Sequence, residues 1–227
     1  MIRVTENFRK IQDLLAKAMV EAGRAPEQIR LLAVSKKKPA DAVLEAYSAG
    51  QRDFGENFVQ EGLEKIAAVD RDDAMWHFIG RLQSNKTKAV SRHFQWVHTI
   101  DRLKIARRLS AQRPPDAADL NVCIEVNIDS EDNKSGVAPD EVGDLAAAVT
   151  ELPRLKLRGL MCLPAIRTDF EEQRRPFSAL RTLMESLNES GLQMDTLSMG
   201  MTADYAAAIR EGATIVRIGT ALFGARE

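Results

Sequence analysis

Short apolar runs alternate with longer segments in which apolar residues recur at helical spacing, and this alternation continues along most of the chain. A short apolar run predicts a buried strand, whereas the helical spacing predicts an amphipathic helix. The predicted strands are residues 31–36, 53–57, 76–80, 96–100, 121–128, 155–164, 196–200 and 215–220. The predicted helices between them are residues 40–49, 59–69, 86–92, 103–112, 141–151, 175–189 and 203–211.

One more helix is predicted ahead of the first strand, over residues 5–22. Phe8, Ile11, Leu15 and Ala18 form its apolar stripe, and Thr5 is suited to cap it. Strands that alternate with helices are typical of a parallel sheet, and eight such units predict a single (β/α)8 TIM barrel. Too few residues follow the last strand for a full eighth helix, so the leading helix is expected to cover that side.

The rival architecture is an open, doubly wound sheet. Its dinucleotide-binding form is disfavoured because no GxGxxG pattern opens any predicted helix.

Composition narrows the class of protein and its possible partners. With 44% hydrophobic and 29% charged residues and a net charge of -1, the chain reads as one globular domain over residues 1–227. The near-zero net charge gives no attraction to nucleic acid or acidic membranes. Apolar runs are too short to span a membrane, and no signal peptide is recognised. We therefore expect a cytoplasmic protein.

Lys36 is the candidate reactive residue. It ends the strand predicted over residues 31–36, and parallel strands of such folds carry their chemistry at that end. If Leu32 and Val34 face the barrel interior, Lys36 does so too, while Lys37 points away. A lysine in an apolar cavity has a lowered pKa and can attack an aldehyde. The competing interpretation is three solvated lysines in a loop.

Arg217 interrupts the apolar strand predicted over residues 215–220. A buried guanidinium needs an acceptor, which is either an internal carboxylate such as Glu125 or a bound ligand. Gly219 and Thr220 then supply backbone amides and a hydroxyl, and the glycine allows close approach of a ligand.

Residues 197–202 end the seventh strand with Ser198, Gly200 and Thr202, directly before the next predicted helix. Loops after the seventh and eighth strands of barrels often bind phosphate. The alternative is an ordinary Ser-Gly turn with a threonine cap. Taken together, a lysine, an arginine and a phosphate loop are what pyridoxal 5'-phosphate requires: an imine partner, a contact to the pyridine nitrogen and a phosphate cradle.

Six motifs closely resemble the pyridoxal phosphate homeostasis protein family, once labelled proline-synthase-associated proteins. They are residues 32–36 (LAVSK), 54–57 (FGEN), 76–80 (WHFIG), 82–86 (LQSNK), 197–201 (LSMGM) and 216–220 (VRIGT). The resemblance extends from about residue 29 to residue 226. It implies a barrel like the alanine racemase N-terminal domain.

The resemblance also implies roles. Lys36 would be the imine (Schiff-base) lysine, Asn57 would pack by the cofactor ring, and Arg217 would meet the ring nitrogen. Ser198, Gly219 and Thr220 would hold the phosphate. The family has no accepted catalytic reaction and is understood to bind the cofactor and pass it on, and its loss disturbs vitamin B6 and amino-acid pools.

Other chemistry-bearing residues are weaker candidates. His77, His93 and His98 have no Cys or carboxylate partners that would complete a metal site, so they are expected to be core or surface histidines. Cys123 and Cys162 are expected to be buried, reduced thiols. Lys134, in a polar loop over residues 129–136, is a candidate second cofactor-contacting lysine, although such loops are usually only solvated. Arg167 and residues 169–175 are interpreted as a solvated loop.

Three functions stay open: a cofactor carrier without turnover, a pyridoxal-phosphate-dependent amino-acid racemase, and a lysine-imine aldolase. A racemase needs a second acid/base opposite the lysine, and the only tyrosines, Tyr47 and Tyr205, fall in predicted outer helices. Alanine racemases take that tyrosine from an additional C-terminal domain of a partner subunit, which we do not expect here. The function as a cofactor carrier is therefore favoured. We expect apo-enzymes to be the acceptors of the cofactor and the protein to be a monomer.

Overall fold

Eight parallel strands close into a barrel in the computed structural model, which describes residues 4–131 and 134–224. The strands are β1 (Arg30–Val34), β2 (Asp53–Glu56), β3 (Met75–Phe78), β4 (Trp96–Ile100), β5 (Leu120–Val126), β6 (Leu155–Cys162), β7 (Thr196–Ser198) and β8 (Ile215–Ile218). Each strand pairs with its sequence neighbour, and β8 pairs back with β1 with Leu32 opposite Arg217. The predicted TIM barrel is confirmed.

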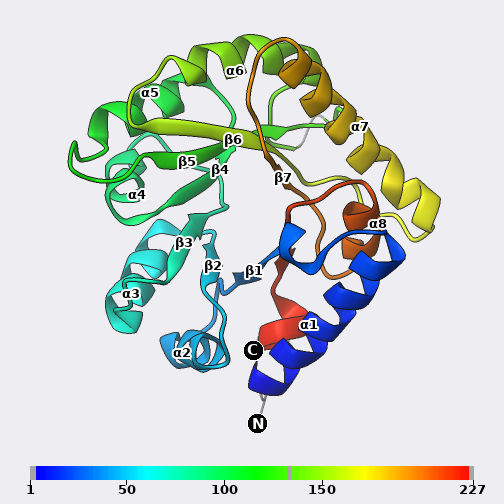
Figure 1. Cartoon of the computed structure of the whole chain (residues 1–227). Helices are drawn as coiled ribbons and strands as arrows, with labels where there is room; N and C mark the ends of the chain where they lie inside the picture. The colour runs from blue at the N-terminus through cyan, green and yellow to red at the C-terminus, as the bar shows by residue number, and fades with distance from the viewer. Residues whose placement is uncertain (1–3, 132–133, 225–227) are drawn as a thin grey trace.

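Helices surround the strands on the outside (Figure 1). They are α1 (Val4–Glu21), α2 (Ala40–Ser48), α3 (Val59–Val69), α4 (Thr87–His93), α5 (Leu103–Gln112), α6 (Val142–Thr150), α7 (Phe170–Glu189), α8 (Tyr205–Arg210) and α9 (Thr220–Phe223), with short 3-10 turns at Pro26–Gln28 and Pro139–Glu141. None of the helices in the described part of the chain is long and apolar enough to cross a membrane.

Helix α1 covers the gap beside the last strand, as expected. It packs against α2, α8 and the four-residue α9, next to which it lies in Figure 1. Its buried residues include Phe8, Ile11 and Leu15. The prediction that Thr5 caps this helix is wrong, because Thr5 lies inside α1 and its N–H and hydroxyl donate to Glu45.

Helix α7 begins five residues earlier than predicted, at Phe170. Asp169 caps it, because its Oδ1 accepts a hydrogen bond from the Glu172 N–H at 2.9 Å. The helix continues through Pro176. The interpretation of residues 169–175 as a loop is therefore wrong, and Arg167 is not merely solvated, since it forms an ion pair with Asp129 at 2.7 Å.

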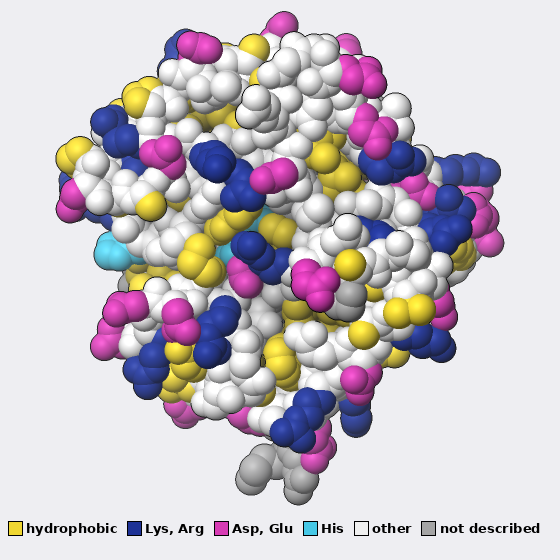
Figure 2. All heavy atoms as spheres, in the orientation of Figure 1, with side chains coloured by type: hydrophobic (Ala, Val, Ile, Leu, Met, Phe, Trp, Pro, Cys, Tyr) yellow, Lys and Arg dark blue, Asp and Glu magenta, His cyan; other side chains and the backbone are white. Residues whose placement is uncertain are grey.

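Side chains from alternate strand positions fill the barrel interior. Leu32, Trp96, Cys123, Met161 and Ile215 form one buried apolar cluster there. The larger cluster lies between the strands and the surrounding helices. On the outer surface, acidic and basic side chains are mixed around a hollow at the centre of the face in Figure 2. The reading of Cys123 and Cys162 as buried thiols is confirmed, and burial raises the pKa of each to about 12.

Candidate functional site

A pocket of about 200 Å³ opens at the carboxyl ends of the strands. Its lining residues are Val34, Lys36, Asn57, Ile79, Met161, Leu163, Met201, Thr202, Arg217, Gly219 and Thr220. Five of the six residues expected to bind a cofactor are among them, from segments at the ends of β1, β2 and β8 that are far apart in sequence. Only Ser198 is not.

Lys36 lies two residues beyond the end of β1, in a turn rather than in the strand itself. Lys37 follows it with φ of 59°, and Lys37 is exposed. The predicted alternation therefore holds past the strand end: Leu32 faces the interior, Val34 and Lys36 line the pocket, and Lys37 points to solvent.

A buried ion cluster from α3 holds this turn. Lys65 Nζ donates to the Ser35 carbonyl at 2.6 Å and to Glu56 and Glu61 at 2.7 Å each. Ser35 Oγ donates to the same Glu56 oxygen at 2.6 Å, and the Lys37 N–H donates to Glu61. The backbone is thus fixed on both sides of Lys36. Sequence reasoning missed this cluster, because Lys65 reads as an ordinary helix-surface lysine.

Arg217 is 4% exposed and donates three hydrogen bonds. They go to the Ser198 carbonyl at 2.5 Å, the Ser198 hydroxyl at 2.9 Å and the Cys162 carbonyl at 2.8 Å. Within the described ranges no carboxylate forms an ion pair with Arg217, so the alternative of Glu125 as its direct partner is not supported. The two charges still influence each other: burial and the charge of Asp101 raise the pKa of Glu125 to about 7, and the charge of Arg217 opposes that rise.

Ser198 lies beneath Arg217 rather than on the pocket wall. It is fully buried, and its hydroxyl contacts His98 Nδ1 at 2.8 Å as well as Arg217. Its expected contact with phosphate stays a prediction. Thr202, from the same predicted loop, is the hydroxyl residue that reaches the pocket.

The loops after β7 and β8 pack tightly. Gly200 has φ of 89°, and a Cβ there would lie 2.6 Å from Ala208, so a side chain does not fit. The Gly200 carbonyl accepts the Arg217 N–H at 3.0 Å, which ties the segment after β7 to strand β8. A Cβ on Gly219 would lie 3.0 Å from the Val34 carbonyl oxygen. Helix α8 starts at Tyr205, two residues later than predicted, because Asp204 accepts the Met201 N–H in a turn.

Asn57 carries a buried side-chain oxygen for which no described residue is a hydrogen-bond partner. Buried polar atoms are normally satisfied, so this oxygen, in a residue that lines the pocket, marks a place for a donor.

Lys134 lies beside the pocket and is not among its lining residues. Its ammonium donates to Glu131 and to the Leu163 carbonyl, both at 3.1 Å. Leu163 itself lines the pocket. Residues 132 and 133 of this loop lie outside the described residues. A cofactor contact from Lys134 stays a prediction.

Tyr47 and Tyr205 lie in α2 and α8, outside the barrel, as predicted. Among the described residues that line the pocket, Lys36 and Arg217 are the only ones with a titratable side chain. The core assignment of His77 and His98 is confirmed, since both are fully buried, and His93 is exposed. No group of three His, Cys, Asp or Glu side chains in the described ranges is placed to hold a metal ion.

Comparisons with known proteins agree with this arrangement. The family model of the alanine racemase N-terminal domain matches residues 4–227. The pyridoxal phosphate homeostasis protein of Pseudomonas aeruginosa is 54% identical, over 100% of this chain and 97% of the relative. The one from Escherichia coli K12 is 50% identical, over 99% of this chain and 97% of the relative.

Solved structures extend the comparison. PipY of Synechococcus elongatus, crystallised with pyridoxal phosphate bound, has a TM-score of 0.81 and 35% identity and covers 92% of this chain and 100% of its own. Alanine racemase of Corynebacterium glutamicum shares the fold, with a TM-score of 0.72 at 17% identity, over 97% of this chain and 59% of its own. The chain therefore belongs to the pyridoxal phosphate homeostasis protein family, whose barrel is that of the alanine racemase N-terminal domain.

Proposed function

We propose that this chain binds pyridoxal 5'-phosphate in the pocket at the carboxyl ends of its strands and serves in vitamin B6 and amino-acid homeostasis. The observation that carries the proposal is the pocket itself, which brings the Lys36 amine, the Arg217 guanidinium, and Gly219 and Thr220 at the start of α9 into one cavity. The names of its relatives and the cofactor in the PipY structure support it.

The residues that line the pocket fit pyridoxal 5'-phosphate. Lys36 would hold the cofactor covalently through Nζ, and Arg217 would donate to the ring nitrogen with an N–H not used by its three protein acceptors. Thr202, Gly219 and Thr220 would bind phosphate, with Ser198 as an indirect contributor through Arg217. When bound, the cofactor supplies an aldehyde for amines and a ring that withdraws electrons.

We propose further that the chain carries the cofactor rather than turning over a substrate. Apart from Lys36 and Arg217, no titratable side chain lines the described pocket, so no second acid/base is evident. With Arg217 as a donor to the ring nitrogen, that nitrogen would stay largely unprotonated, and the ring would be a weaker electron sink. Candidate acceptors are apo-enzymes that need the cofactor. A monomeric state stays a prediction.

The proposal is tested first at Lys36. The purified protein should be yellow, and Lys36→Ala should lose the visible absorption band, because the amine that binds the cofactor is gone. Lys37→Ala is the matched control, since Lys37 is adjacent and exposed, and it should keep the band. An unchanged spectrum in Lys36→Ala would remove Lys36 from its role. Protein that is colourless even with added cofactor would favour the aldolase.

Arg217 is tested by replacement with Glu, and with Gln in case the buried acid prevents folding. Either change should weaken cofactor binding, and Arg217→Glu should also shift the visible spectrum by favouring a protonated ring nitrogen. Binding as tight as wild type, with no spectral change, would make Arg217 a purely structural residue.

The carrier role is tested by two assays on the same preparation. Chiral analysis of alanine and other amino acids after long incubation should show no racemisation at an enzyme-like rate. Transfer of cofactor to an apo-aminotransferase should occur. Turnover above roughly 1 per second, the low edge of typical enzymes, would favour the racemase instead.

A further inference from the structure

A chain of hydrogen bonds crosses the barrel interior and ends at Arg217. Asp53 Oδ1 contacts His77 Nε2 at 2.9 Å, and His77 Nδ1 contacts His98 Nε2 at 2.9 Å. His98 Nδ1 contacts the Ser198 hydroxyl at 2.8 Å, and that hydroxyl accepts from Arg217 at 2.9 Å. Strands β2, β3, β4, β7 and β8 each contribute one residue. This series of hydrogen bonds therefore links the amino end of β2 with the proposed cofactor pocket.

Both imidazoles are held rigidly. His77 and His98 are fully buried, and the Trp96 indole stacks on the His77 ring with 5.3 Å between ring centroids and 8° between planes. Burial lowers the pKa of His77 despite the opposing charge of Asp53, and burial lowers the pKa of His98 well below its usual range. Each ring is therefore neutral near pH 7, with one N–H and one acceptor nitrogen.

The direction of every hydrogen bond follows from Asp53. An ionised carboxylate only accepts, so His77 must carry its proton on Nε2, which leaves Nδ1 as an acceptor. His98 then has to donate from Nε2, and its Nδ1 becomes an acceptor as well. The Ser198 hydroxyl must donate to that nitrogen. Its oxygen lone pairs are thereby left for Arg217, whose guanidinium can only donate.

We propose that Asp53, His77, His98 and Ser198 form a one-way hydrogen-bond relay that keeps the Ser198 hydroxyl an acceptor and so positions the Arg217 guanidinium in the pocket. Hydrogen bonds in a chain polarise one another in a medium of low dielectric constant, so the contact at Arg217 is strengthened from a distance. These four are positioning residues. The consequence for cofactor binding rests on the proposed function, whereas the proton positions do not.

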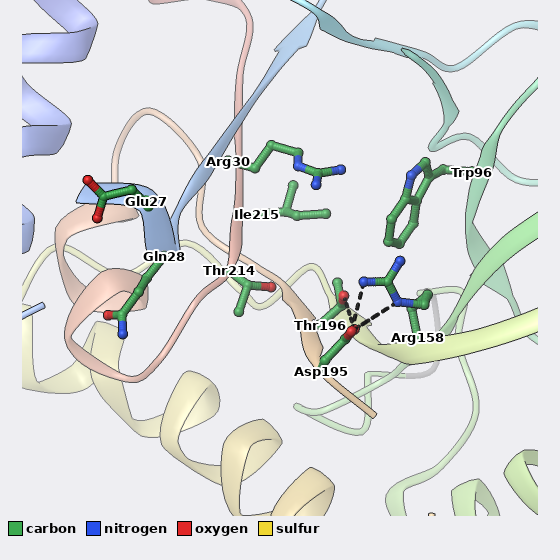
Figure 3. Close-up of a pocket in the computed structure, with 9 residues that line it drawn as sticks. All are labelled: Glu27, Gln28, Arg30, Trp96, Arg158, Asp195, Thr196, Thr214 and Ile215. Atoms are coloured by element: carbon green, nitrogen blue, oxygen red, sulfur yellow. Dashed lines mark hydrogen bonds and ion pairs between the residues drawn. The ribbon is translucent and has the colours of Figure 1, made fainter. Parts of the chain in front are cut away.

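The base of the relay lies beside a second pocket, of about 210 Å³. In Figure 3, Arg30 and Arg158 both lie near the Trp96 ring, and Arg158 is bonded to Asp195. Arg30 pairs with Asp53 at 3.3 Å. Two arginine–aspartate pairs therefore lie beside the same indole, and only one of them includes a residue of the relay. The Arg158–Asp195 pair is therefore an internal control for the Arg30–Asp53 pair.

The test compares Asp53→Ala, Asp53→Asn and Asp195→Ala. Asp53→Ala removes the acceptor that sets the direction and should raise the dissociation constant of pyridoxal phosphate about threefold to tenfold, the effect of one hydrogen bond. Asp53→Asn keeps an oxygen for His77 and Arg30 and should stay within about twofold of wild type. Asp195→Ala breaks the matched ion pair and should also stay within about twofold. Equal binding by Asp53→Ala and Asp195→Ala would overturn the proposal.

Nitrogen-15 NMR of the imidazoles tests the relay without cofactor and without any variant. Wild-type protein should show His77 and His98 as neutral rings protonated on Nε2, with exposed His93 as the solvated reference. A proton on Nδ1 of either buried ring would overturn the relay even if pyridoxal phosphate binds. Conversely, correct tautomers in a protein that does not bind the cofactor would refute the proposed function and leave the relay standing.

Discussion

At the scale of single residues, the turn at Lys36 depends on a buried charge cluster. Glu56 is fully buried and Lys65 is nearly so, with 2.7 Å between their charged atoms. Burial raises the pKa of Glu56, while the hydrogen bonds from Lys65 and Ser35 oppose the rise. One oxygen of Glu56 has no partner among the described residues. The cluster is therefore sensitive to loss of either charge, because removing one partner leaves the other buried and uncompensated.

Lys65→Met should lower the free energy of unfolding by about 3–5 kcal/mol, the usual effect of leaving a buried charge unpaired. The double variant Glu56→Gln, Lys65→Met should be more stable than the single one, because no buried charge remains. Urea denaturation of the three proteins measures both effects. A single variant as stable as wild type, or a double variant no better than the single, would contradict this account.

Glu125 should make the stability of the folded state depend on pH. Its pKa is about 7 in the fold against an ordinary value of 4.5, mainly because it is buried. The folded state therefore holds a proton that the unfolded state has lost between these values, so this group's contribution to stability falls as pH rises from 4.5 to 7.

Glu125→Gln should remove that contribution. Relative to the variant, wild type should lose about 3 kcal/mol of unfolding free energy between pH 4 and pH 8. Denaturation of both proteins at the two pH values measures the difference, so that other titrating groups cancel. If the stability of the two proteins changes equally with pH, the pKa of Glu125 in the fold is close to its ordinary value.

At the scale of elements, α1 closes the outer layer of helices. Its buried face carries Phe8, Ile11 and Leu15, while Leu14 on its other side is 50% exposed. Burial of an apolar side chain stabilises the fold in proportion to the area removed from water. Side chains on the buried face should therefore contribute far more to the free energy of unfolding than those on the exposed face.

Phe8→Ala should destabilise the protein by about 3–5 kcal/mol, because it removes a large buried side chain and leaves a cavity. Leu14→Ala on the same helix is the control and should change stability by less than about 0.5 kcal/mol. Thermal or urea unfolding compares them. Similar losses in both variants would indicate that α1 contributes helix propensity alone, and not cover for the barrel.

At the scale of the whole molecule, the barrel presents a pocket at each end. The one at the carboxyl ends is the proposed cofactor site, while the one at the amino ends is lined by arginines already paired with Asp53 and Asp195. Binding to the folded state alone stabilises the whole protein by mass action.

Pyridoxal phosphate at about a hundredfold excess over its dissociation constant should add about 2.7 kcal/mol, which raises the unfolding midpoint by about 5–10 °C for a chain of this size. Pyridoxal, which lacks the phosphate, should give a smaller rise at the same concentration. Differential scanning fluorimetry measures both. An equal rise with the two ligands would mean that Thr202, Gly219 and Thr220 do not bind the phosphate.

The sequence by itself determined the order of elements, the eight strands and the covering role of α1. The strand ends also predicted that Lys36, Arg217, Gly219 and Thr220 lie together, and the family resemblance added Asn57. All five line one pocket, whereas Ser198, which was predicted to bind with them, does not. These features are local: a strand shows its period and its end, and all parallel strands end on the same side of a barrel. Boundaries were least certain where capping decided them, as at Asp169.

Only the tertiary structure decided which inward-facing residues meet. The acceptors of Arg217 come from β6 and β7, the two buried histidines touch across adjacent strands, and Lys65 reaches the Ser35 carbonyl from α3. Each contact depends on strand register and on the stagger that closes the barrel. Periodicity tells which face a side chain occupies, but it carries no information on that register, so the relay and the cluster around Lys36 could not be read from the sequence.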